Sequence, residues 1–362
     1  MKFKIFLSAL VLAAVSFSLT SCDTDVEKID VQDLTKYDAQ YFANLRAWKQ
    51  TPHEISYAYY ASWSNTQNPT SWGERLLGLP DSIDIVNLWT DVPTPESYPI
   101  AYQDMVYCQK VKGTRFVMHG DASHYRHTFW DRVWNEETEQ FEYVYQTTVD
   151  PETGEELPVY ETTLNEETGE IEVVLDENGQ PKKKHVMVTT NANDEYSLRS
   201  YARWAVDTVV RCGLDGVDFD YEGWSSGPMS IVANECDKFF GPEGKWSEKL
   251  FIIDWFNGAP SGCDEYTDFF IRQAYTWQIG FQTGSGGRPI EKTVLCESTG
   301  AESEKGGVNG ARVRDYAAWE PAGTHKGGFG AYYLDYNYKS ESGIPYKEFR
   351  EAIQIQNPAL HK

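Results

Sequence analysis

The sequence predicts an α/β protein with the architecture of a (β/α)8 TIM barrel. Apolar, β-prone runs alternate with helical or loop stretches along most of the chain, which indicates parallel strands joined by crossover connections. Eight such runs occur in order, and eight is the number that closes a parallel barrel. The chain has 362 residues, a length that is large for one domain but normal for a barrel.

The first three predicted strands each end at or close to a residue that a barrel would place at the rim where its active site lies. These residues are Trp63, Trp89 and His119, and each is either a site residue or an ordinary packing residue. The helical spacing of apolar residues over 195–212 predicts an amphipathic helix that leads into the fourth strand. The predicted strands cover residues 55–60, 83–89, 115–119, 214–224, 250–256, 269–275, 293–298 and 328–336.

The fourth predicted strand carries an unusual set of acids. Alternation along a strand puts Asp218, Asp220 and Glu222 on one face and apolar residues on the other. Adjacent carboxylates repel when buried, so such a face indicates either a metal site or a catalytic carboxylate array. A solvated face of an edge strand is the alternative. The apolar residues opposite and the glycines on both sides favour a strand buried on both faces.

The spacing Asp-x-x-Asp-x-Asp-x-Glu, from Asp215 to Glu222, resembles the signature of glycoside hydrolase family 18. The resemblance implies a (β/α)8 barrel with this motif on the fourth strand, and the activity of a chitinase or an endo-β-N-acetylglucosaminidase. On the sixth strand, Gln273 and Tyr275 form a Gln-x-Tyr pair that is similar to the endo-β-N-acetylglucosaminidase branch. The third strand lacks the Ser-x-Gly-Gly pattern common in chitinases, which favours the same branch.

The resemblance also implies the roles of the motif residues. Glu222 would protonate the leaving oxygen and then deprotonate water, while the acetamido oxygen of the substrate attacks to give an oxazolinium intermediate. Asp220 would hold the acetamido N–H, and Asp218 would share a proton with Asp220. Gln273 and Tyr275 would hydrogen-bond the acetamido group from the opposite wall. Asp215 is expected to be structural, and no metal or cofactor is expected.

The predicted reaction is hydrolysis of the GlcNAc-β1,4-GlcNAc core of N-linked glycans, with retention. N-glycans of glycoproteins are therefore the expected partners. Two alternatives remain open, a catalytically weak glycan-binding lipoprotein and a chitinase. The candidate substrate-binding residues are Trp89, His119, Trp255, Asn257 and Tyr333.

The N-terminus predicts export and lipidation. Residues 1–21 combine a basic start with a short apolar run, which is typical of a signal peptide. The ending Leu-x-Ser-Cys resembles a bacterial lipoprotein box with Cys22 as the lipidated residue, and an ordinary cleaved signal is the alternative. Residues 22–45 are then a tether, and 46–362 the barrel. We expect an extracytoplasmic, lipid-anchored protein on the bacterial outer membrane, similar to surface lipoproteins of Bacteroidetes, with glycan uptake machinery as a candidate partner.

Residues 135–185 interrupt the barrel pattern after the third strand. Three similar 15-residue units begin at Asn135, Asp150 and Asn165, and Glu-Thr turns between β-prone runs predict a hairpin arm built from a repeat. Residues 135–179 hold 15 acids and no Lys or Arg, so they supply −15 of the formal net charge of −23. Such an arm either repels anionic competitors, supports a partner, or simply solubilises an insertion, and the sequence favours the last of these. No nucleic-acid partner is expected.

Five cysteines follow Cys22 at wide spacings, without a Cys-x-x-Cys pair. This pattern argues against a disulfide framework and against a zinc cluster. Most of these cysteines are predicted to be small buried apolar residues.

Overall fold

The computed structural model describes residues 37–123, 125–276, 280–300, 307 and 312–358. The predicted signal peptide and Cys22 lie outside these residues. Within the described part, no helix has both the length and the apolar character needed to cross a membrane. A helix, α2 (Ala39–Lys49), spans the predicted boundary between tether and barrel.

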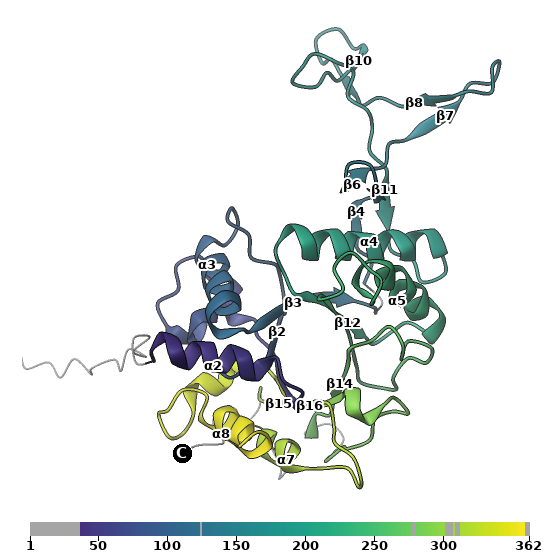
Figure 1. Ribbon diagram of the computed structural model, residues 1–362. Helices are drawn as coiled ribbons and strands as arrows, with labels where there is room; N and C mark the ends of the chain where they lie inside the picture. Colours follow the sequence, from purple (N-terminus) through teal and green to yellow (C-terminus); the bar gives the residue numbers. More distant parts are fainter. Residues whose placement is uncertain (1–36, 124, 277–279, 301–306, 308–311, 359–362) are drawn as a thin grey trace, which may run out of the picture. The chain divides into compact units, whose positions relative to one another are not determined.

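Eight parallel strands close a barrel, as the sequence predicts, and each predicted run overlaps one of them (Figure 1). The fold class is therefore confirmed. In spatial order the strands are β1 (Ile55–Tyr59), β16 (Gly328–Tyr332), β15 (Thr293–Ser298), β14 (Phe269–Gln273), β13 (Leu250–Trp255), β12 (Gly216–Tyr221), β3 (Arg115–Asp121) and β2 (Ile85–Leu88).

Helices surround the strands. The predicted helix before the fourth strand is α4 (Glu195–Arg211), whose first turn is capped by the Asp194 carboxylate accepting from the Tyr196 backbone N–H at 3.1 Å. It packs against β3 and β12. The other helices are α3 (Pro99–Tyr107) with a π-helical extension (Cys108–Lys112), α5 (Ser226–Phe240), α7 (Val313–Ala318) and α8 (Lys347–Gln356), together with short 3₁₀ turns at Ser62–Ser64, Trp72–Glu74, Leu76–Gly78, Ile290–Lys292 and Leu334–Lys339.

Alternation along each strand divides the core into two layers. Val217 and Phe219 of β12 face outward and are fully buried in the apolar layer beneath the helices. The inward positions of the barrel are apolar at its lower levels, as with Ile252, and polar towards the carboxyl ends. Gly216, at the start of β12, is required by close packing, because a Cβ there would collide with the Leu250 carbonyl oxygen. The five described cysteines are all buried and unpaired, which confirms their predicted packing role.

The predicted arm lies between β3 and α4, and Figure 1 follows it in teal away from the barrel strands. It is a stem of two paired strands, followed by three short antiparallel hairpins and a turn at the tip, rather than one long hairpin. Each β-prone run that spans two hairpins breaks into two strands where the hairpins meet. The arm strands are β4 (Thr128–Trp130) paired with β11 (Met187–Thr189), β5 (Arg132–Asn135) with β6 (Gln140–Tyr143), β7 (Thr147–Val149) with β8 (Glu156–Pro158), and β9 (Thr162–Leu164) with β10 (Ile171–Val173).

A repeated ring of backbone hydrogen bonds joins the hairpins. At each junction, three chain segments meet, and one residue from each donates its N–H to the next around a closed triangle, with N–O distances of 2.8–3.1 Å. Two segments of each ring belong to the chain leading away from the barrel, and the third, the returning segment, leads back to it. From one ring to the next, the residue numbers on the two outgoing segments increase by 15, and the number on the returning segment decreases by two. The rings join residues 131, 144 and 186, then 146, 159 and 184, then 161, 174 and 182.

The predicted 15-residue units each begin with a turn that their first side chain builds. The Asn135 side-chain oxygen accepts from the backbone N–H groups of Glu137 and Thr138 at 2.8 and 3.3 Å. Asp150 and Asn165 repeat this arrangement two and three residues further along their own units. Such side-chain turns explain why Asn and Asp stand at these positions.

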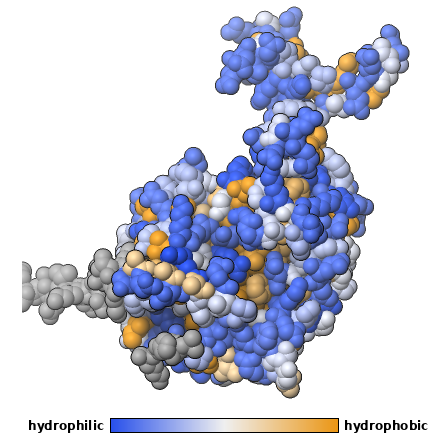
Figure 2. All heavy atoms as spheres, in the orientation of Figure 1, coloured by the Kyte–Doolittle hydropathy of each residue, from blue (hydrophilic) through white to orange (hydrophobic). Residues whose placement is uncertain are grey.

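The base of the arm is fixed to the barrel helices. The Arg132 guanidinium donates to the Asp207 carboxylate on α4 at 2.7 Å, and the Tyr196 hydroxyl of the same helix donates to Asp131 at 2.5 Å. Trp134 packs edge-on against Trp246, with ring centroids 5.3 Å apart. Beyond this base, the strands of the second and third hairpins are almost entirely exposed, and Figure 2 shows mainly hydrophilic residues there.

Candidate active site

The carboxyl ends of the barrel strands surround an open hollow of about 530 Å³, which we call the main hollow. Its walls combine carboxylates with aromatic rings, a composition suited to a sugar, which presents hydroxyl groups at its edge and C–H groups on its faces. It is lined by Tyr59, Trp89, His119, Asp220, Glu222, Asp254, Phe256, Gln273, Tyr275, Tyr332 and Tyr333.

Asp218 lies deepest of the three motif acids and is fully buried. The Tyr57 hydroxyl and the Asn87 side-chain amide, the latter at 2.9 Å, both donate to its Oδ2. Burial raises the pKa of Asp218 to about 6, although the hydrogen bond from Tyr57 opposes this effect. Asp218 therefore holds its proton more tightly than a free aspartate does, in an enclosed position beneath the hollow.

Asp220 stands one step higher on β12, and its side chain is 23% exposed to the main hollow. Gln273 Nε2 donates to its Oδ1 at 3.1 Å. Burial, followed by the negative charge of Glu222, raises the pKa of Asp220 to about 7. This carboxyl therefore changes its protonation near neutral pH, and its state depends on neighbouring groups.

Glu222 follows the end of β12 and lines two adjoining hollows. Besides the main hollow, it borders a side hollow of about 340 Å³, and Phe256 is the other residue common to both. A carboxyl between two adjoining spaces is placed to act on a bond that runs from one to the other. The side hollow is lined by Tyr221, Glu222, Gly223, Trp224, Phe256, Asn257 and Gly258.

Gln273 and Tyr275 both line the main hollow, as expected for residues two apart at the end of a strand. The Tyr275 ring stacks on Tyr332, with centroids 5.2 Å apart and planes 20° apart. Burial raises the pKa of the Tyr275 phenol well above its usual value, so this residue is a neutral hydrogen-bond donor.

The loop after β14 is held by a second buried acid, Glu297 on β15. The backbone N–H of Thr276 donates to its Oε1 at 3.1 Å, and that of Ser298 at 2.7 Å. Burial raises the pKa of Glu297 to about 7. Because Thr276 directly follows Tyr275, this carboxyl helps to fix the position of the phenol.

Three of the predicted substrate-binding residues lie on the wall of the main hollow. Trp89 packs edge-on against Tyr332 and Tyr333, with centroids 5.0 and 5.2 Å apart, and forms an aromatic wall with them. His119 Nε2 is 3.9 Å from Asp220 Oδ2, too far for a hydrogen bond. Desolvation lowers the pKa of His119 to about 4, so its imidazole is neutral at neutral pH.

Asn257 lies in the side hollow, whereas the prediction for Trp255 is wrong. Strand alternation places Asp254 inward and Trp255 outward, in the apolar layer beneath the helices, where it is 3% exposed. The Arg272 guanidinium covers its ring at 5.1 Å from the centroid. Trp255 is thus a packing residue and contacts neither hollow.

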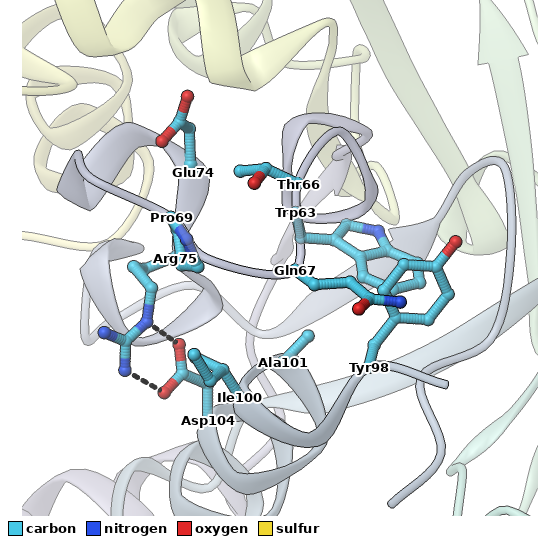
Figure 3. A pocket seen from close by; sticks show the side chains of 10 residues that line it. All are labelled: Trp63, Thr66, Gln67, Pro69, Glu74, Arg75, Tyr98, Ile100, Ala101 and Asp104. Atoms are coloured by element: carbon cyan, nitrogen blue, oxygen red, sulfur yellow. Dashed lines mark hydrogen bonds and ion pairs between the residues drawn. The ribbon is translucent and has the colours of Figure 1, made fainter. Parts of the chain in front are cut away.

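Trp63 is also a packing residue, which decides between the two interpretations of that position. It is 2% exposed and borders a cavity of only about 10 Å³ outside the barrel (Figure 3). Nearby, the Arg75 guanidinium forms two hydrogen bonds of 2.6 Å with the Asp104 carboxylate. A space of this size holds about one water molecule and no larger ligand. Asp215 is structural as predicted, since its Oδ2 accepts from the Phe116 backbone N–H at 2.8 Å.

Sequence reasoning missed several residues that build the hollow. Asp254 is fully buried on β13, and the register of the sheet pairs it with Asp220. A charged residue inside the apolar run of β13 was the signal that could have revealed it. The others are aromatic or amide residues at inward positions, with no local signal: Tyr59, Asn87, Phe256 and Tyr332.

Comparison with known proteins agrees with this geometry. The family model described as glycoside hydrolase family 18, BT1044-like, matches residues 22–119. Endo-beta-N-acetylglucosaminidase F2 of Elizabethkingia meningoseptica is 22% identical over 395 residues, with 98% of each chain covered.

Two solved structures share the fold. A variant of BT1044 has a TM-score of 0.56 and 19% identity, over 88% of this chain and 93% of its own. The apo form of an endo-beta-N-acetylglucosaminidase from Cordyceps militaris has a TM-score of 0.55 and 17% identity, over 89% and 97%.

The barrel, the carboxylate site and these relatives together identify the chain as a glycoside hydrolase. Within that class, the family model and the sequence relative confirm the resemblance to glycoside hydrolase family 18, and they support its endo-β-N-acetylglucosaminidase branch.

Proposed function

We propose that this protein is an endo-β-N-acetylglucosaminidase that cleaves the GlcNAc-β1,4-GlcNAc core of N-linked glycans by a retaining, substrate-assisted mechanism. The observation that carries the proposal is the position of Glu222 between two hollows of unequal size. The main hollow, with its acetamido-binding groups, takes the sugar whose bond is broken. The side hollow takes the sugar that remains on the protein.

The groups around the main hollow suit an intramolecular attack by the acetamido oxygen. Asp220, when ionised, accepts a hydrogen bond from the acetamido N–H, which makes the oxygen more nucleophilic and orients it. The neutral Tyr275 phenol donates to the same group. The oxazolinium intermediate is positively charged, and the negative charge of the ionised Asp220 below it stabilises that charge.

Glu222 then acts twice. As an acid, it donates its proton to the glycosidic oxygen while the bond to the leaving sugar breaks, and as a base, it later takes a proton from the water that opens the oxazolinium ring. Enzymes of this family are exceptions to the usual pair of carboxylates in retaining glycosidases, because the substrate supplies the nucleophile. The protein therefore needs one carboxyl in the acid/base role.

Defined glycoproteins provide the direct test. Incubation with high-mannose, hybrid and complex glycoproteins should release glycans that end in one GlcNAc, and leave one GlcNAc on the protein, as measured by mass spectrometry of both products. Chitin oligosaccharides form the comparison. Release of dimers from chitin without action on any glycoprotein would replace this proposal with a chitinase.

We further propose that the protein is lipid-anchored at Cys22 on the bacterial outer membrane and faces outward. The supporting observations are the signal-like residues 1–21 and the Leu-x-Ser-Cys ending. Several acyl chains anchor a protein firmly, at about 0.8 kcal/mol per buried methylene. At the surface, the enzyme would release glycans from glycoproteins too large to import, for uptake by neighbouring transport machinery.

Cell fractionation tests this location. The substitution Cys22→Ala should move the protein from the membrane to the soluble fraction while activity is kept. Protease added to intact cells should degrade the wild-type protein. Complete protection in intact cells, with lipid attached, would place the enzyme on an inward-facing leaflet.

A further inference from the structure

Asp254 is a buried carboxyl directly beside the catalytic motif, and the mechanism above does not use it. It is fully buried, and the parallel pairing of β12 with β13 sets it level with Asp220. Gln273 Nε2 lies between the two acids and donates to Oδ1 of Asp254 at 2.5 Å and to Oδ1 of Asp220 at 3.1 Å. One amide nitrogen thus holds both carboxyls in a common position.

The second oxygen of Asp254 has a different environment. Oδ2 is buried and receives no hydrogen bond from any donor in the described part of the chain. An ionised carboxylate with a bare buried oxygen is costly, whereas a protonated one turns that oxygen into a donor. Among the described residues, the groups shown to interact with Asp254 from the surrounding strands include no cation. These groups are Tyr57 and Tyr59 of β1, Asp218 and Asp220 of β12, Gln273 and Tyr275 beside β14, and Cys296 of β15.

We propose that Asp254 is a positioning residue that stays protonated and donates a hydrogen bond to Asp220, which keeps Asp220 ionised for the acetamido N–H. The inference rests on the proposed function, since it concerns the same reaction. Asp254 does not touch the reacting atoms of the substrate. Its effect passes entirely through Asp220.

The directions of the pKa shifts of Asp254 and Asp220 agree with this hydrogen bond. Burial, followed by the negative charges of Asp220 and Asp218, raises the pKa of Asp254 well above its usual value. For Asp220, burial and Glu222 raise the pKa, while the hydrogen bond from Asp254 lowers it. A donor to the charged form favours that form. Without this donor, the pKa of Asp220 would rise further, and a smaller fraction would be ionised at neutral pH.

Two substitutions of similar volume separate this role from a structural one. Asp254→Asn keeps a neutral donor that cannot ionise, whereas Asp254→Val suits a strand but donates nothing. The readouts are kcat/KM on a defined glycopeptide from pH 5 to 9, binding of a thiazoline mimic of the intermediate over the same range, and the melting temperature.

We expect Asp254→Asn to stay within about threefold of wild type, with the acidic limb of the pH profile unmoved. Asp254→Val should move the acidic limb to higher pH by about one unit. On that limb kcat/KM should be about tenfold lower than in the wild type, because one pKa unit is a factor of ten, and it should recover at higher pH. An equal loss at every pH in both variants, with a lower melting temperature, would make Asp254 a packing residue. An unmoved limb in Asp254→Val would also overturn the proposal.

A direct measurement does not depend on the Val variant folding. In protein labelled with carboxyl ¹³C aspartate, one signal should keep the shift of a protonated acid at pH 8 and be absent from Asp254→Asn. If the Asp254 signal titrates in the ordinary range of an aspartate, the proposal fails. This measurement needs no turnover, so a wild-type protein that cleaves no N-glycan would refute the proposed function while the state of Asp254 is still determined.

Discussion

The barrel interior and the arm are both rich in carboxylates, but the two regions hold them in opposite environments. Asp218, Asp220 and Asp254 are enclosed by barrel strands, and burial raises the pKa of each. In the arm, the acids stand in solvent, and the pKa values of Glu139 and Glu142 are lowered by hydrogen bonds, chiefly from Lys245 and Asn135 respectively. Asp218 and Asp254 are fully buried, whereas the 15 acids of residues 135–179 are exposed or half-buried. Burial, rather than the number of charges, decides whether the pKa of a carboxyl rises in this protein.

The largest difference in kcat should appear between two variants in which one Glu is replaced, one in the barrel and one in the arm. Glu222→Gln keeps the shape of the side chain but cannot transfer the proton, so kcat should fall by at least about 10²–10⁴-fold, with glycan binding kept. The exposed arm residue provides the matched control, and Glu166→Gln should leave kcat unchanged. Comparable loss in both variants, or full activity in Glu222→Gln, would contradict the assignment of the acid.

A smaller effect is expected at the acetamido step. Asp220→Asn should lower kcat by about 10²–10³-fold, the range typical of one group that stabilises developing charge. A glycan with a hydroxyl in place of the acetamido group should not be cleaved by the wild-type enzyme, and a thiazoline should inhibit it. Turnover of the hydroxyl analogue, followed by mass spectrometry, would show that a protein carboxylate is the nucleophile instead.

The pH dependence of stability should reflect the buried acids and not the arm. The folded-state pKa values of Asp218, Asp220 and Glu297 are raised to about 6, 7 and 7. The folded state thus binds more protons than the unfolded state, in which these groups titrate near pH 4. Their contribution to the unfolding free energy is present below about pH 4 and is lost as the pH rises to about 7.

The melting temperature should accordingly fall by a few degrees between pH 5 and 8 at constant ionic strength. Asp220→Asn should flatten this slope, and Glu166→Gln should leave it unchanged. A melting temperature that rises over this range, or a wild-type slope in Asp220→Asn, would show that other groups dominate the proton balance.

The smallest effect is expected from shortening the arm. Removing residues 147–183 and joining Gln146 to Lys184 by a short turn keeps the first ring and the base of the arm. Because the removed strands pair only with one another and with the returning segment, activity on a glycopeptide should change less than about twofold, and the melting temperature by little. A tenfold loss on that small substrate would show that the arm contributes to the site.

The barrel was predictable because its strands are short apolar runs with a clear alternation, and the motif residues because four acids at fixed spacing are rare. Asp254 and Trp255 show the limit of this approach. A strand sequence that is apolar on both faces does not reveal which face points into the barrel. Because side chains alternate, moving the inferred register by one residue exchanges the inward and outward side chains. The sequence therefore favoured Trp255, whereas the inward side chain is Asp254.

The aromatic wall was predictable only in part. Trp89 and Tyr333 follow recognisable strands, but Tyr332 and Tyr59 enter the hollow because β1 and β16 are neighbours in a closed barrel. That adjacency joins residues more than 270 positions apart and leaves no local pattern. The same holds for the rings of the arm, where the 15-residue repeat was visible in the sequence but the partner segment was not.

The geometry of these rings sets a rule for how such an arm can grow. Each further ring adds 15 residues to the outgoing chain and two to the returning segment. The three segments then run in the same directions as in the ring before it. One more copy of the unit, inserted together with two residues on the returning side, would therefore fit without altering any junction beneath it. Length can change in whole steps of this kind, and insertions of other sizes would leave backbone groups unpaired at a junction. The arm is in this sense an extensible spacer whose reach evolution can adjust while the catalytic barrel stays constant.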